Sequence, residues 1–412
     1  MEILEIANII KENGGKLYLV GGAVRDKLLC KEVHDEDYCI TGITSEEFEK
    51  LFPEAHLRGK FFGVYDFEGN EFAIARKEKK TGKGHKEFKI ENGKAITIEE
   101  DLKRRDITIN SIAEEVLTGN LIDPFNGIKD IKNKLIRATS NSFMEDPLRV
   151  YRVARFAATL DFDVEENTID MMKILKSELN TLPKERVFTE FKKALNSNKP
   201  SRFFNILKKA DVLDIHFKEI YNLIGSIQPE KYHPEGDSYN HTMIVVDKCA
   251  MLTKELQTRY AALVHDLGKG ITPKEMQPHH YGHDIKGVKI VEEFSNRIGV
   301  PNSWKKCGKI SAKEHMRGGI FNKMTPAKQV DFITNVSKSM LGLEGMKIVV
   351  ICDRWRGEEK PRDINFDILG KQILQNINGD FIKKKYNIKN EEIGEKLRQE
   401  RIELLKSIEN KN

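Results

Sequence analysis

Residues 17–42 read LYLVGGAVRDKLLCKEVHDEDYCITG. The apolar segment at residues 17–20 predicts a β-strand, and two glycines follow it directly. An amphipathic segment comes next, and a second predicted strand begins at Asp35. Because alternate residues of a strand point to the same side, Asp35 and Asp37 are expected to project from one face.

These two carboxylates predict a metal site. Without a partner they would repel each other and raise each other's pKa, and a divalent cation such as Mg²⁺ removes that cost. Gly21 and Gly22 open a predicted helix, whose free backbone N–H groups can bind a phosphate. Metal carboxylates opposite a phosphate site are what nucleotidyl transfer requires. The alternative is a surface hairpin with solvated acids.

Further motifs continue along about the first 200 residues. They are KRRDITIN at 103–110, DPFNG at 123–127 and EDPLRVYRVARF at 145–156. With the glycine pair and the D-x-D strand, they resemble in order and spacing the tRNA nucleotidyltransferases, or CCA-adding enzymes. This branch of the polymerase-β-like superfamily is shared with bacterial poly(A) polymerases.

The resemblance implies a fold and an activity. The fold is an α/β polymerase-β-like nucleotidyltransferase head, followed by an all-α neck and body and, further on, an all-α HD domain. The activity is template-independent addition of C, C and A, from CTP and ATP, to the 3′ end of tRNA. The tRNA elbow and acceptor stem are expected to lie along the neck and body. Two Mg²⁺ ions are expected to assist the transfer.

The resemblance also implies roles for single residues in the nucleotide site. Asp35 and Asp37 are the expected catalytic carboxylates and Mg²⁺ ligands, with Glu71 as a third carboxylate and Asp66 as its competitor. The expected nucleotide contacts are Gly22, Arg25, Arg105, Asp106, Asp146, Arg149, Arg152 and Arg155.

Asp146 and Arg149 have a more specific expected role. At spacing i and i+3 on a predicted helix they share one face, and the simplest interpretation is a salt bridge. In the family they hydrogen-bond the Watson–Crick edge of the incoming base. Such a pair accepts cytosine and adenine, whereas guanine and uracil would leave buried groups unpaired.

A second chemical signal follows in LVHDLGK, residues 263–269, which resembles the HD phosphohydrolase superfamily. His241 precedes it and Asp353 follows, so the ligand order is His241, His265, Asp266 and Asp353. Imidazole and carboxylate ligands of this kind suit a transition metal such as Ni²⁺, Co²⁺ or Mn²⁺. His283 and His315, with His280, are candidates for a second metal position or a phosphate contact.

The HD resemblance implies phosphatase and 2′,3′-cyclic phosphodiesterase activity. A helical tail that only binds tRNA is the alternative. Prolines and glycines interrupt the helical patterns, and residues 228–236 are expected to be a linker. These boundaries predict three domains. They are a head at 1–140, a neck and body at 141–228 and an HD domain with helical tail at 229–412.

Charge, cysteine content and hydropathy indicate where the protein acts and what it can bind. The 412 residues carry a mild net charge of +5, and lysines gather in a glycine-containing loop between Arg76 and Lys94, which we expect to face nucleotide or RNA. Five scattered cysteines predict reduced thiols, and no apolar run predicts a signal peptide or membrane span. We therefore expect a cytoplasmic protein without a membrane partner, acting as a monomer or homodimer.

Three other functions remain as alternatives. A partial enzyme would add only CC or only A, and a poly(A) polymerase would share the head motifs. The HD signal favours CCA addition over the poly(A) polymerase. A non-enzymatic RNA-binding protein is disfavoured, because both aspartates of the D-x-D strand are present.

Overall fold

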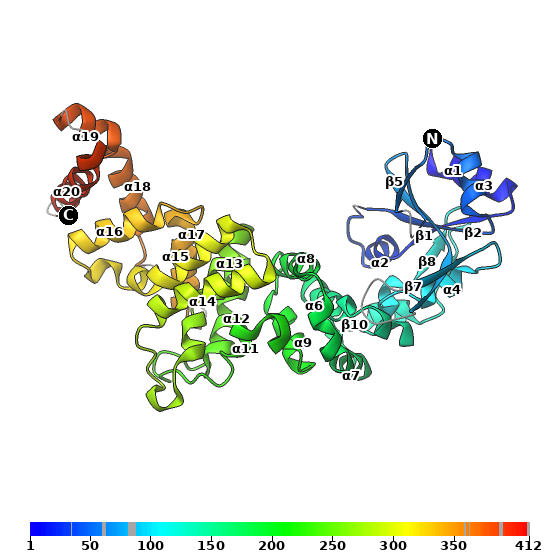
Figure 1. Ribbon diagram of the computed structural model, residues 1–412, viewed down its shortest axis with the longest axis horizontal. Coiled ribbons are helices and arrows are strands. Elements are labelled where there is room, and N and C mark those ends of the chain that lie inside the picture. The colour runs from blue at the N-terminus through cyan, green and yellow to red at the C-terminus, as the bar shows by residue number, and fades with distance from the viewer. Residues whose placement is uncertain are drawn as a thin grey trace. The chain divides into compact units, whose positions relative to one another are not determined.

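A computed structural model describes residues 1–33, 35–59, 63–80, 88–357, 360–361, 363–386 and 390–409. Two compact units divide the chain (Figure 1). Unit 1 comprises Met1–Arg186 and Asn205–Val212, and unit 2 comprises Val187–Phe204 and Leu213–Asn412. This two-way division does not test the predicted three domains, which stay a prediction.

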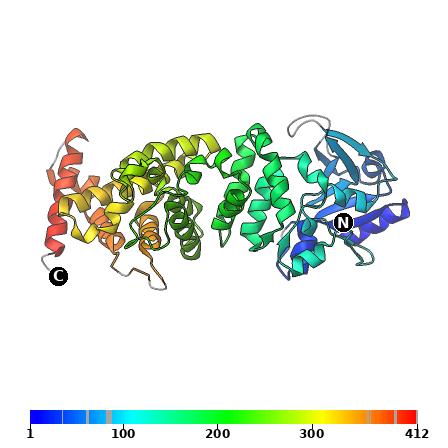
Figure 2. The same ribbon diagram turned by 90° about the horizontal axis from the view of Figure 1, so that it is seen from below.

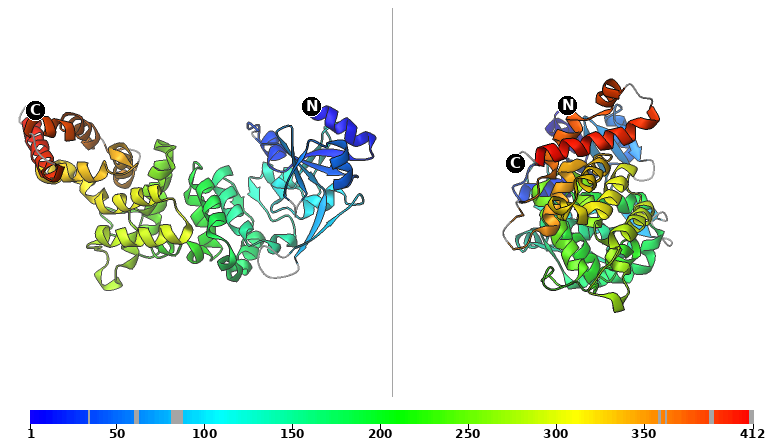
Figure 3. Two further views of the ribbon diagram at one scale, coloured as in Figure 1. Left: turned by 45° about the horizontal axis from the view of Figure 1, so that its top comes forward. Right: turned by 90° about the vertical axis from the view of Figure 1, so that its left-hand side faces the viewer.

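A mixed sheet forms the centre of unit 1 (Figure 3, left). Strands β2 and β5 are parallel, and the other neighbouring strands run antiparallel. In spatial order, the described strands of this sheet are β3 (His56–Gly59), β4 (Val64–Phe67), β5 (Asn70–Ile74), β2 (Asp37–Thr41), β1 (Lys16–Val20), β8 (Ala113–Glu115) and β9 (Leu121–Ile122).

The two faces of the sheet bury different side chains, because successive side chains along a strand point to opposite faces. One face carries an aromatic cluster around Phe48 of α3 (Ser45–Leu51), which packs on Tyr65 and Phe72. The other face places Tyr18, Val20 and Cys39 against α4 (Ile98–Lys103). Asp37 alternates with Tyr38 and therefore belongs to the α4 side.

Strands β4 and β5 form a β-hairpin. Phe67 pairs with Asn70, so Glu68 and Gly69 are the two turn residues. Both have positive φ, 50° and 79°, as a two-residue hairpin turn of this hand requires. This turn sets the register between β4 and β5 and so fixes the position of Glu71 in the sheet.

The lysine-containing loop is only partly described. Strands β6 (Arg76–Lys80) and β7 (Phe88–Asn92) form an antiparallel pair, and Lys77 binds Glu100 at 2.6 Å. Lys83 and Lys86 lie outside the described residues, so the expected role of the loop stays a prediction.

The remaining short elements of unit 1 surround the sheet, and longer helices follow from residue 148 (Figure 2). Asp123 of the DPFNG turn accepts hydrogen bonds from the backbone N–H groups of Gly127 and Ile128, which starts α5. The bounds are α1 (Ile3–Glu12), α2 (Gly22–Leu28), α5 (Gly127–Lys132), β10 (Leu135–Ile136), α6 (Leu148–Leu160), β11 (Asp163–Val164), α7 (Glu166–Ile174), α8 (Lys184–Leu195) and α9 (Ser201–Lys209).

Unit 2 is helical, as predicted for the HD part of the chain. Its helices are α10 (Leu213–His216), α11 (Lys218–Tyr221), α12 (Ser238–Leu252), α13 (Leu256–Val264), α14 (His283–Ile298), α15 (Asn302–Gly319), α16 (Pro326–Val336), α17 (Gly342–Arg354), α18 (Phe366–Asn376), α19 (Gly379–Tyr386) and α20 (Asn390–Glu409).

Helices α12, α13 and α17 share one apolar core, with Val245, Ala261 and Val350 fully buried. The Arg259 guanidinium is also fully buried and donates to the backbone carbonyls of Leu195, Ser197, Ala250 and Thr253. Carbonyls at helix ends otherwise lack partners, so Arg259 joins the end of α8 to the HD helices. Among the described residues, no helix combines the length and apolar character needed to cross a bilayer.

Candidate functional site

The glycine pair and the D-x-D sequence meet at the end of strand β1. Strand β2 begins at Asp37, two residues later than predicted, and Asp35 precedes it in an exposed extended segment. Val20 pairs with Asp37, so the chain that turns at Gly21 passes beside this carboxylate. Gly21 has φ of +72°, and a Cβ there would lie 2.9 Å from Nη1 of Arg105. Only glycine meets both constraints without strain.

A cavity of about 300 Å³ opens beside Asp37, and all its lining residues belong to unit 1. Five arginines and three aspartates share its wall with an asparagine and a glycine pair, so the lining is strongly polar and carries a positive excess. The lining residues are Gly21, Gly22, Asp37, Arg104, Arg105, Asp106, Asn110, Asp146, Leu148, Arg149, Arg152 and Arg186.

Most predicted nucleotide contacts therefore lie together. Gly22, Asp37, Arg105, Asp106, Asp146, Arg149 and Arg152 line the cavity. Asp35, Arg25, Glu71 and Arg155 are not among the lining residues.

Asp106 is the buried anion of this cavity. Its carboxylate accepts hydrogen bonds from Arg152 Nε at 2.7 Å, from the Ile107 backbone N–H at 2.9 Å and from Asn110 Nδ2 at 3.4 Å. Burial by itself raises the pKa of Asp106, but the charges of Arg152 and Arg149 outweigh it and lower the pKa to about 2. Asp106 is therefore ionised at neutral pH and orients Arg152.

Asp101 is a second buried acid, and it orients Arg104 and Arg105. It is 1% exposed and binds Arg104 at 2.7 Å and Arg105 at 3.2 Å. Burial raises the pKa of Asp101, and the charges of Arg104 and Arg105 lower it below its usual value. The i, i+3 and i, i+4 spacing of these residues is a helix ion-pair signal that could have identified Asp101 in the sequence.

Asp37 has the opposite shift. Partial burial raises the pKa of its carboxyl, the charge of Arg105 opposes that rise, and the neighbouring Asp35 adds to it. A carboxylate whose charge is disfavoured in this way, with a second carboxylate beside it, is a favourable ligand for a divalent cation.

The predicted helix face shared by Asp146 and Arg149 is wrong in one respect. Asp146 has extended backbone and precedes the first residue of α6, Leu148, whose N–H its carboxylate accepts at 3.0 Å. Its other oxygen lies 3.3 Å from Arg186 Nη2. Arg149 donates to the backbone carbonyls of Ser142 and Arg104. Both side chains are thus held in place on the cavity wall.

Arg25 lies beside Gly22 and is buried. Its guanidinium donates to both oxygens of Asp26 and to Oδ1 of Asn110 at 2.7 Å, and it lies 5.4 Å from the Phe156 ring centroid. These contacts favour a role in positioning Asn110. The predicted phosphate contact of Arg25 stays a prediction, as does that of Arg155, which stacks on Phe156 at 3.8 Å.

Glu71 gains support from the register of the sheet. It pairs with Asp37 across the parallel strands β2 and β5, and paired residues point to the same face. Asp66 pairs with Glu71 and is one strand farther from Asp37. Arg58 contacts both Asp66 and Glu71.

In unit 2, four predicted ligands form one cluster. The ligand atoms of His241, His265, Asp266 and Asp353 all lie within 4.8 Å of one another. His241 Nε2 is 3.0 Å from Asp353, and His265 Nε2 is 3.2 Å from Asp266. Burial lowers the pKa of His265, but the two aspartates raise it to about 10, which reflects a strongly negative centre.

The histidines are oriented toward this centre by their other ring nitrogen. Nδ1 of His265 faces the Ala262 carbonyl at 2.7 Å, and Nδ1 of His241 faces Glu235 at 2.6 Å. Nε2 of His265 and both carboxylate oxygens of Asp266 are buried, and among the described residues their close contacts are ion pairs rather than well-formed hydrogen bonds. Buried ligand atoms that face one centre, on histidines whose Nδ1 atoms are held by other groups of the protein, fit a metal ion.

Asp266 also faces a second cluster. Its Oδ1 lies 3.3 Å from Nε2 of His283 and 3.3 Å from Nε2 of His315, while Oδ2 faces the first cluster. His283 and His315 again place Nδ1 on backbone carbonyls. The predicted additional ligands are thus brought to the same carboxylate, on its other side. Lys269 approaches Oδ2 at 2.6 Å.

The segment expected to be a linker belongs to this site. Glu235 supports His241, and Gln228, Pro229, Tyr232 and His233 line a cavity of about 740 Å³ with His283, His315 and Asp353.

Residues that the sequence interpretation missed are Asp101, Arg104, Leu148 and Arg186 in unit 1, and Gln228, Glu235 and Lys269 in unit 2. Lys269, four residues after His265 in HDLGK, was the easiest to find.

Comparisons with known proteins match both the head and the HD part of the chain. Residues 17–137 match the Poly A polymerase head domain, residues 161–223 match the probable RNA and SrmB-binding site of polymerase A, and residues 238–336 match the HD domain. A multifunctional CCA protein of Shewanella frigidimarina is 44% identical over 307 residues, 73% of each chain. One of Psychromonas ingrahamii is 43% identical over 308 residues, 73% of this chain and 74% of that one.

Solved structures support the fold. A CCA-adding enzyme with CTP has a TM-score of 0.65 at 20% identity, covering 98% of this chain and 91% of that chain. A tRNA nucleotidyltransferase complexed with a primer tRNA and an incoming ATP analogue has a TM-score of 0.57 at 25% identity, covering 84% of this chain and 94% of that chain. The head, the helical remainder and the HD signal are therefore confirmed, and the chain belongs to the multifunctional CCA proteins, the bacterial CCA-adding tRNA nucleotidyltransferases that carry an HD domain.

Proposed function

We propose that unit 1 adds C, C and A to tRNA 3′ ends from CTP and ATP by metal-assisted nucleotidyl transfer. The observation that carries the proposal is one cavity where Asp37, the glycine turn and five arginines meet. The arginines provide the charge needed for a triphosphate, since guanidinium groups bind phosphate oxygens in pairs. The tRNA and nucleotides present in the solved relatives support the same partners.

The chain's own residues would act in sequence on the bound nucleotide. Gly21 and Gly22 let the triphosphate approach the backbone, and Arg105 and Arg152 neutralise it. Asp146 and Arg149 read the base edge. Asp35 and Asp37 would hold Mg²⁺, which would activate the tRNA 3′-hydroxyl and stabilise pyrophosphate. The hydroxyl gives up its proton to solvent, its oxygen bonds to the α-phosphorus, and the bond from the α-phosphorus to pyrophosphate breaks.

We also propose that unit 2 hydrolyses 2′,3′-cyclic phosphates and phosphomonoesters. His241, His265, Asp266 and Asp353 would hold one transition metal ion, and Asp266, His283 and His315 are the residues that would hold a second. A bound metal ion would supply a nucleophilic water at neutral pH. In the cyclic substrate, a water oxygen bonds to phosphorus, one P–O bond to ribose breaks, and the freed ribose oxygen takes the proton.

The first test is incorporation into tRNA that lacks CCA, with CTP alone, ATP alone and both together. Wild-type protein should add CC with CTP and complete CCA with both nucleotides. Asp37→Ala should abolish incorporation while tRNA binding persists. Addition of only CC or only A would identify a partial enzyme, and a long A tail would identify a poly(A) polymerase.

A matched control lies within the same short segment. Glu36 carries the same charge but accepts a hydrogen bond from Tyr38 OH, away from the cavity. Glu36→Gln should retain incorporation. Near-wild-type incorporation by Asp37→Ala would overturn the assignment of the catalytic carboxylate.

A further inference from the structure

Gln228 has an unused hydrogen-bond donor on the wall of the unit 2 cavity. The residue is 3% exposed, and its Oε1 accepts a hydrogen bond from Lys269 Nζ at 2.7 Å. Its amide nitrogen Nε2 is buried and has no hydrogen-bond partner among the described residues. Because an unpaired buried donor is unfavourable, this nitrogen points to a missing acceptor.

Lys269 connects this amide to the metal-ligand cluster. Lys269 is 7% exposed and its Nζ also lies 2.6 Å from Oδ2 of Asp266. Gln228 is therefore joined to the carboxylate shared by both clusters through one hydrogen bond and one ion pair. An acceptor oxygen bound here would lie beside the metal ligands, where a phosphate must be placed for hydrolysis.

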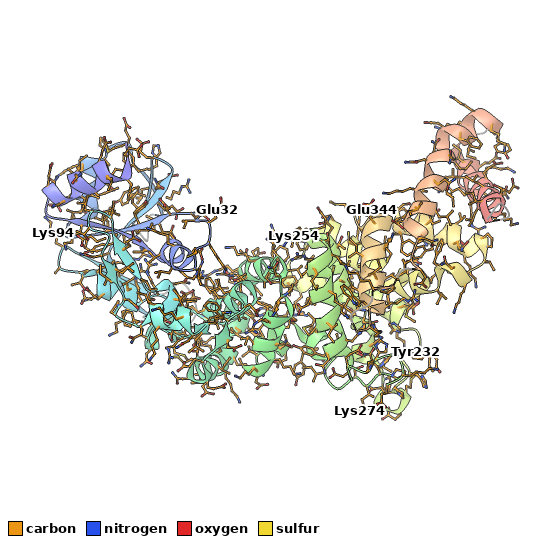
Figure 4. All side chains as sticks on the ribbon, turned by 180° about the vertical axis from the view of Figure 1, so that it is seen from behind. Glu32, Lys94, Tyr232, Lys254, Lys274 and Glu344 are labelled. Carbon is orange, nitrogen blue, oxygen red and sulfur yellow. The ribbon has the colours of Figure 1, made fainter. Side chains whose placement is uncertain are left out.

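The backbone around Gln228 is held in position. The N–H of Ile227 donates to Oε1 of Gln277 at 2.9 Å, and the carbonyl of Ile227 faces Nε2 of His280 at 2.9 Å. Figure 4 shows Tyr232 and Lys274, from these two segments, at the same edge of unit 2. The amide is thus presented by an anchored segment.

The outer wall of the cavity has a different character. Tyr281 is 72% exposed and stacks on His279 with centroids 5.6 Å apart, and both line the cavity. Lys323, Arg354 and Arg356 also line it. Aromatic faces with nearby cations are the features that bind unpaired bases of RNA, and a cavity of about 740 Å³ has room for more than a phosphate.

We propose that this cavity binds the 3′-terminal nucleotide of an RNA. The Gln228 amide donates to a phosphate oxygen beside Asp266, and the ring of Tyr281 stacks on the terminal base. This inference rests on the hydrolytic function proposed for unit 2, and it adds two substrate contacts, Gln228 for the phosphate and Tyr281 for the base.

The test is equilibrium binding of adenosine 3′-phosphate and of inorganic phosphate to the full-length Mn²⁺-loaded protein, measured by calorimetry. Gln228→Glu keeps the acceptor for Lys269 but replaces the donor with a carboxylate oxygen, so both ligands should bind at least tenfold more weakly. Tyr281→Ala should weaken the nucleotide tenfold or more and leave inorganic phosphate unchanged. Tyr221→Ala, at an exposed tyrosine outside the cavity, is the control and should change neither affinity.

Thermal unfolding and bound-metal content should match wild type in all three variants. The Arg105→Ala variant, which removes a cation from the unit 1 cavity, should retain the binding, and weaker binding in this variant would place its source in unit 1. Wild-type affinity of Gln228→Glu for both ligands would overturn the phosphate contact. Equal loss of both ligands in Tyr281→Ala would overturn the stacking contact.

Hydrolysis of adenosine 2′,3′-cyclic phosphate in the same preparations separates the two proposals. If wild-type protein binds adenosine 3′-phosphate through Gln228 and Tyr281 but does not hydrolyse the cyclic substrate, only the hydrolytic function fails. If it hydrolyses that substrate and neither variant affects binding, only the present inference fails.

Discussion

At the scale of single residues, the nucleotide cavity depends on buried acids that position arginines. Asp106 holds Arg152 at 2.7 Å, and Asp101 holds both Arg104 and Arg105. A guanidinium that is already oriented loses less conformational freedom when phosphate binds. The buried acids are therefore part of the binding site even where they touch no substrate.

Asp106→Asn should lower the free energy of unfolding by about 2 kcal/mol at pH 7, since the native pKa of about 2 lies below the ordinary value. A depressed carboxyl pKa contributes stability above the unfolded-state pKa, and that stability is lost as pH falls through the native value. The difference from wild type should therefore shrink between pH 4 and pH 2.

Urea unfolding of both proteins across this pH range measures the effect. Glu54→Gln, at an exposed acid of unit 1, is the control and should differ little from wild type at any pH. A deficit for Asp106→Asn that stays constant down to pH 2 would contradict the assigned ionisation of Asp106.

At the scale of elements, strand register decides which acids can share a metal. The hairpin turn at Glu68 and Gly69 places Glu71 opposite Asp37, with Asp66 one strand farther. A one-residue slip would turn these side chains to the other face.

Glu71→Gln should reduce incorporation strongly and raise the Mg²⁺ concentration needed for half-maximal rate, because one oxygen ligand loses its charge. Asp66→Asn is the matched variant, since both acids contact Arg58. Incorporation rates across a Mg²⁺ titration measure both. A larger effect of Asp66→Asn would assign the third carboxylate to Asp66.

A second element-scale contact joins α8 to Asp146, two residues before α6. Arg186 lies 3.3 Å from Asp146 and helps to orient it toward the cavity. If Asp146 reads the base edge, Asp146→Ala should relax nucleotide selection about ten- to hundredfold, because a good hydrogen-bonded base contact is worth about 1–3 kcal/mol.

Single-turnover incorporation of CTP, ATP, UTP and GTP measures this selectivity. Arg186→Ala should relax it in the same direction by a smaller factor, whereas Lys184→Ala, at an exposed lysine of α8, should not. Unchanged selectivity in Asp146→Ala, together with lower stability, would favour a purely structural role for Asp146.

At the scale of the whole molecule, the chain contains two polar sites, each built within one compact unit. The HD site carries imidazole ligands that suit transition metals, and the nucleotide site carries carboxylates that suit Mg²⁺. The two activities should therefore separate by mutation and by metal.

The double variant His265→Ala with Asp266→Ala should lose hydrolysis of 2′,3′-cyclic phosphate and keep CTP and ATP addition, and Asp35→Ala should do the reverse. Ni²⁺, Co²⁺ or Mn²⁺ should support hydrolysis better than Mg²⁺. Parallel assays on the same preparations measure both activities. Loss of nucleotide addition in a folded HD double variant would show that the sites depend on each other.

Short motifs were enough to predict the family and the α/β head, and they indicated which residues gather in each candidate site. The glycine pair, RRD at 104–106 and HD at 265–266 act through neighbouring residues, so their chemistry can be inferred from local spacing. This is why six of the predicted nucleotide contacts line one cavity together with Asp37, and all four predicted HD ligands cluster.

Contacts between distant segments were decided only by the tertiary structure. The pairing of Asp37 with Glu71, the arrival of Arg186 beside Asp146 and the use of residues 228–236 as a wall of the HD site join positions that local patterns do not relate. Proline and glycine in residues 228–236 indicate a turn but not what the turn packs against. That depends on burial and hydrogen bonding with segments such as 272–280, which only the folded chain brings together.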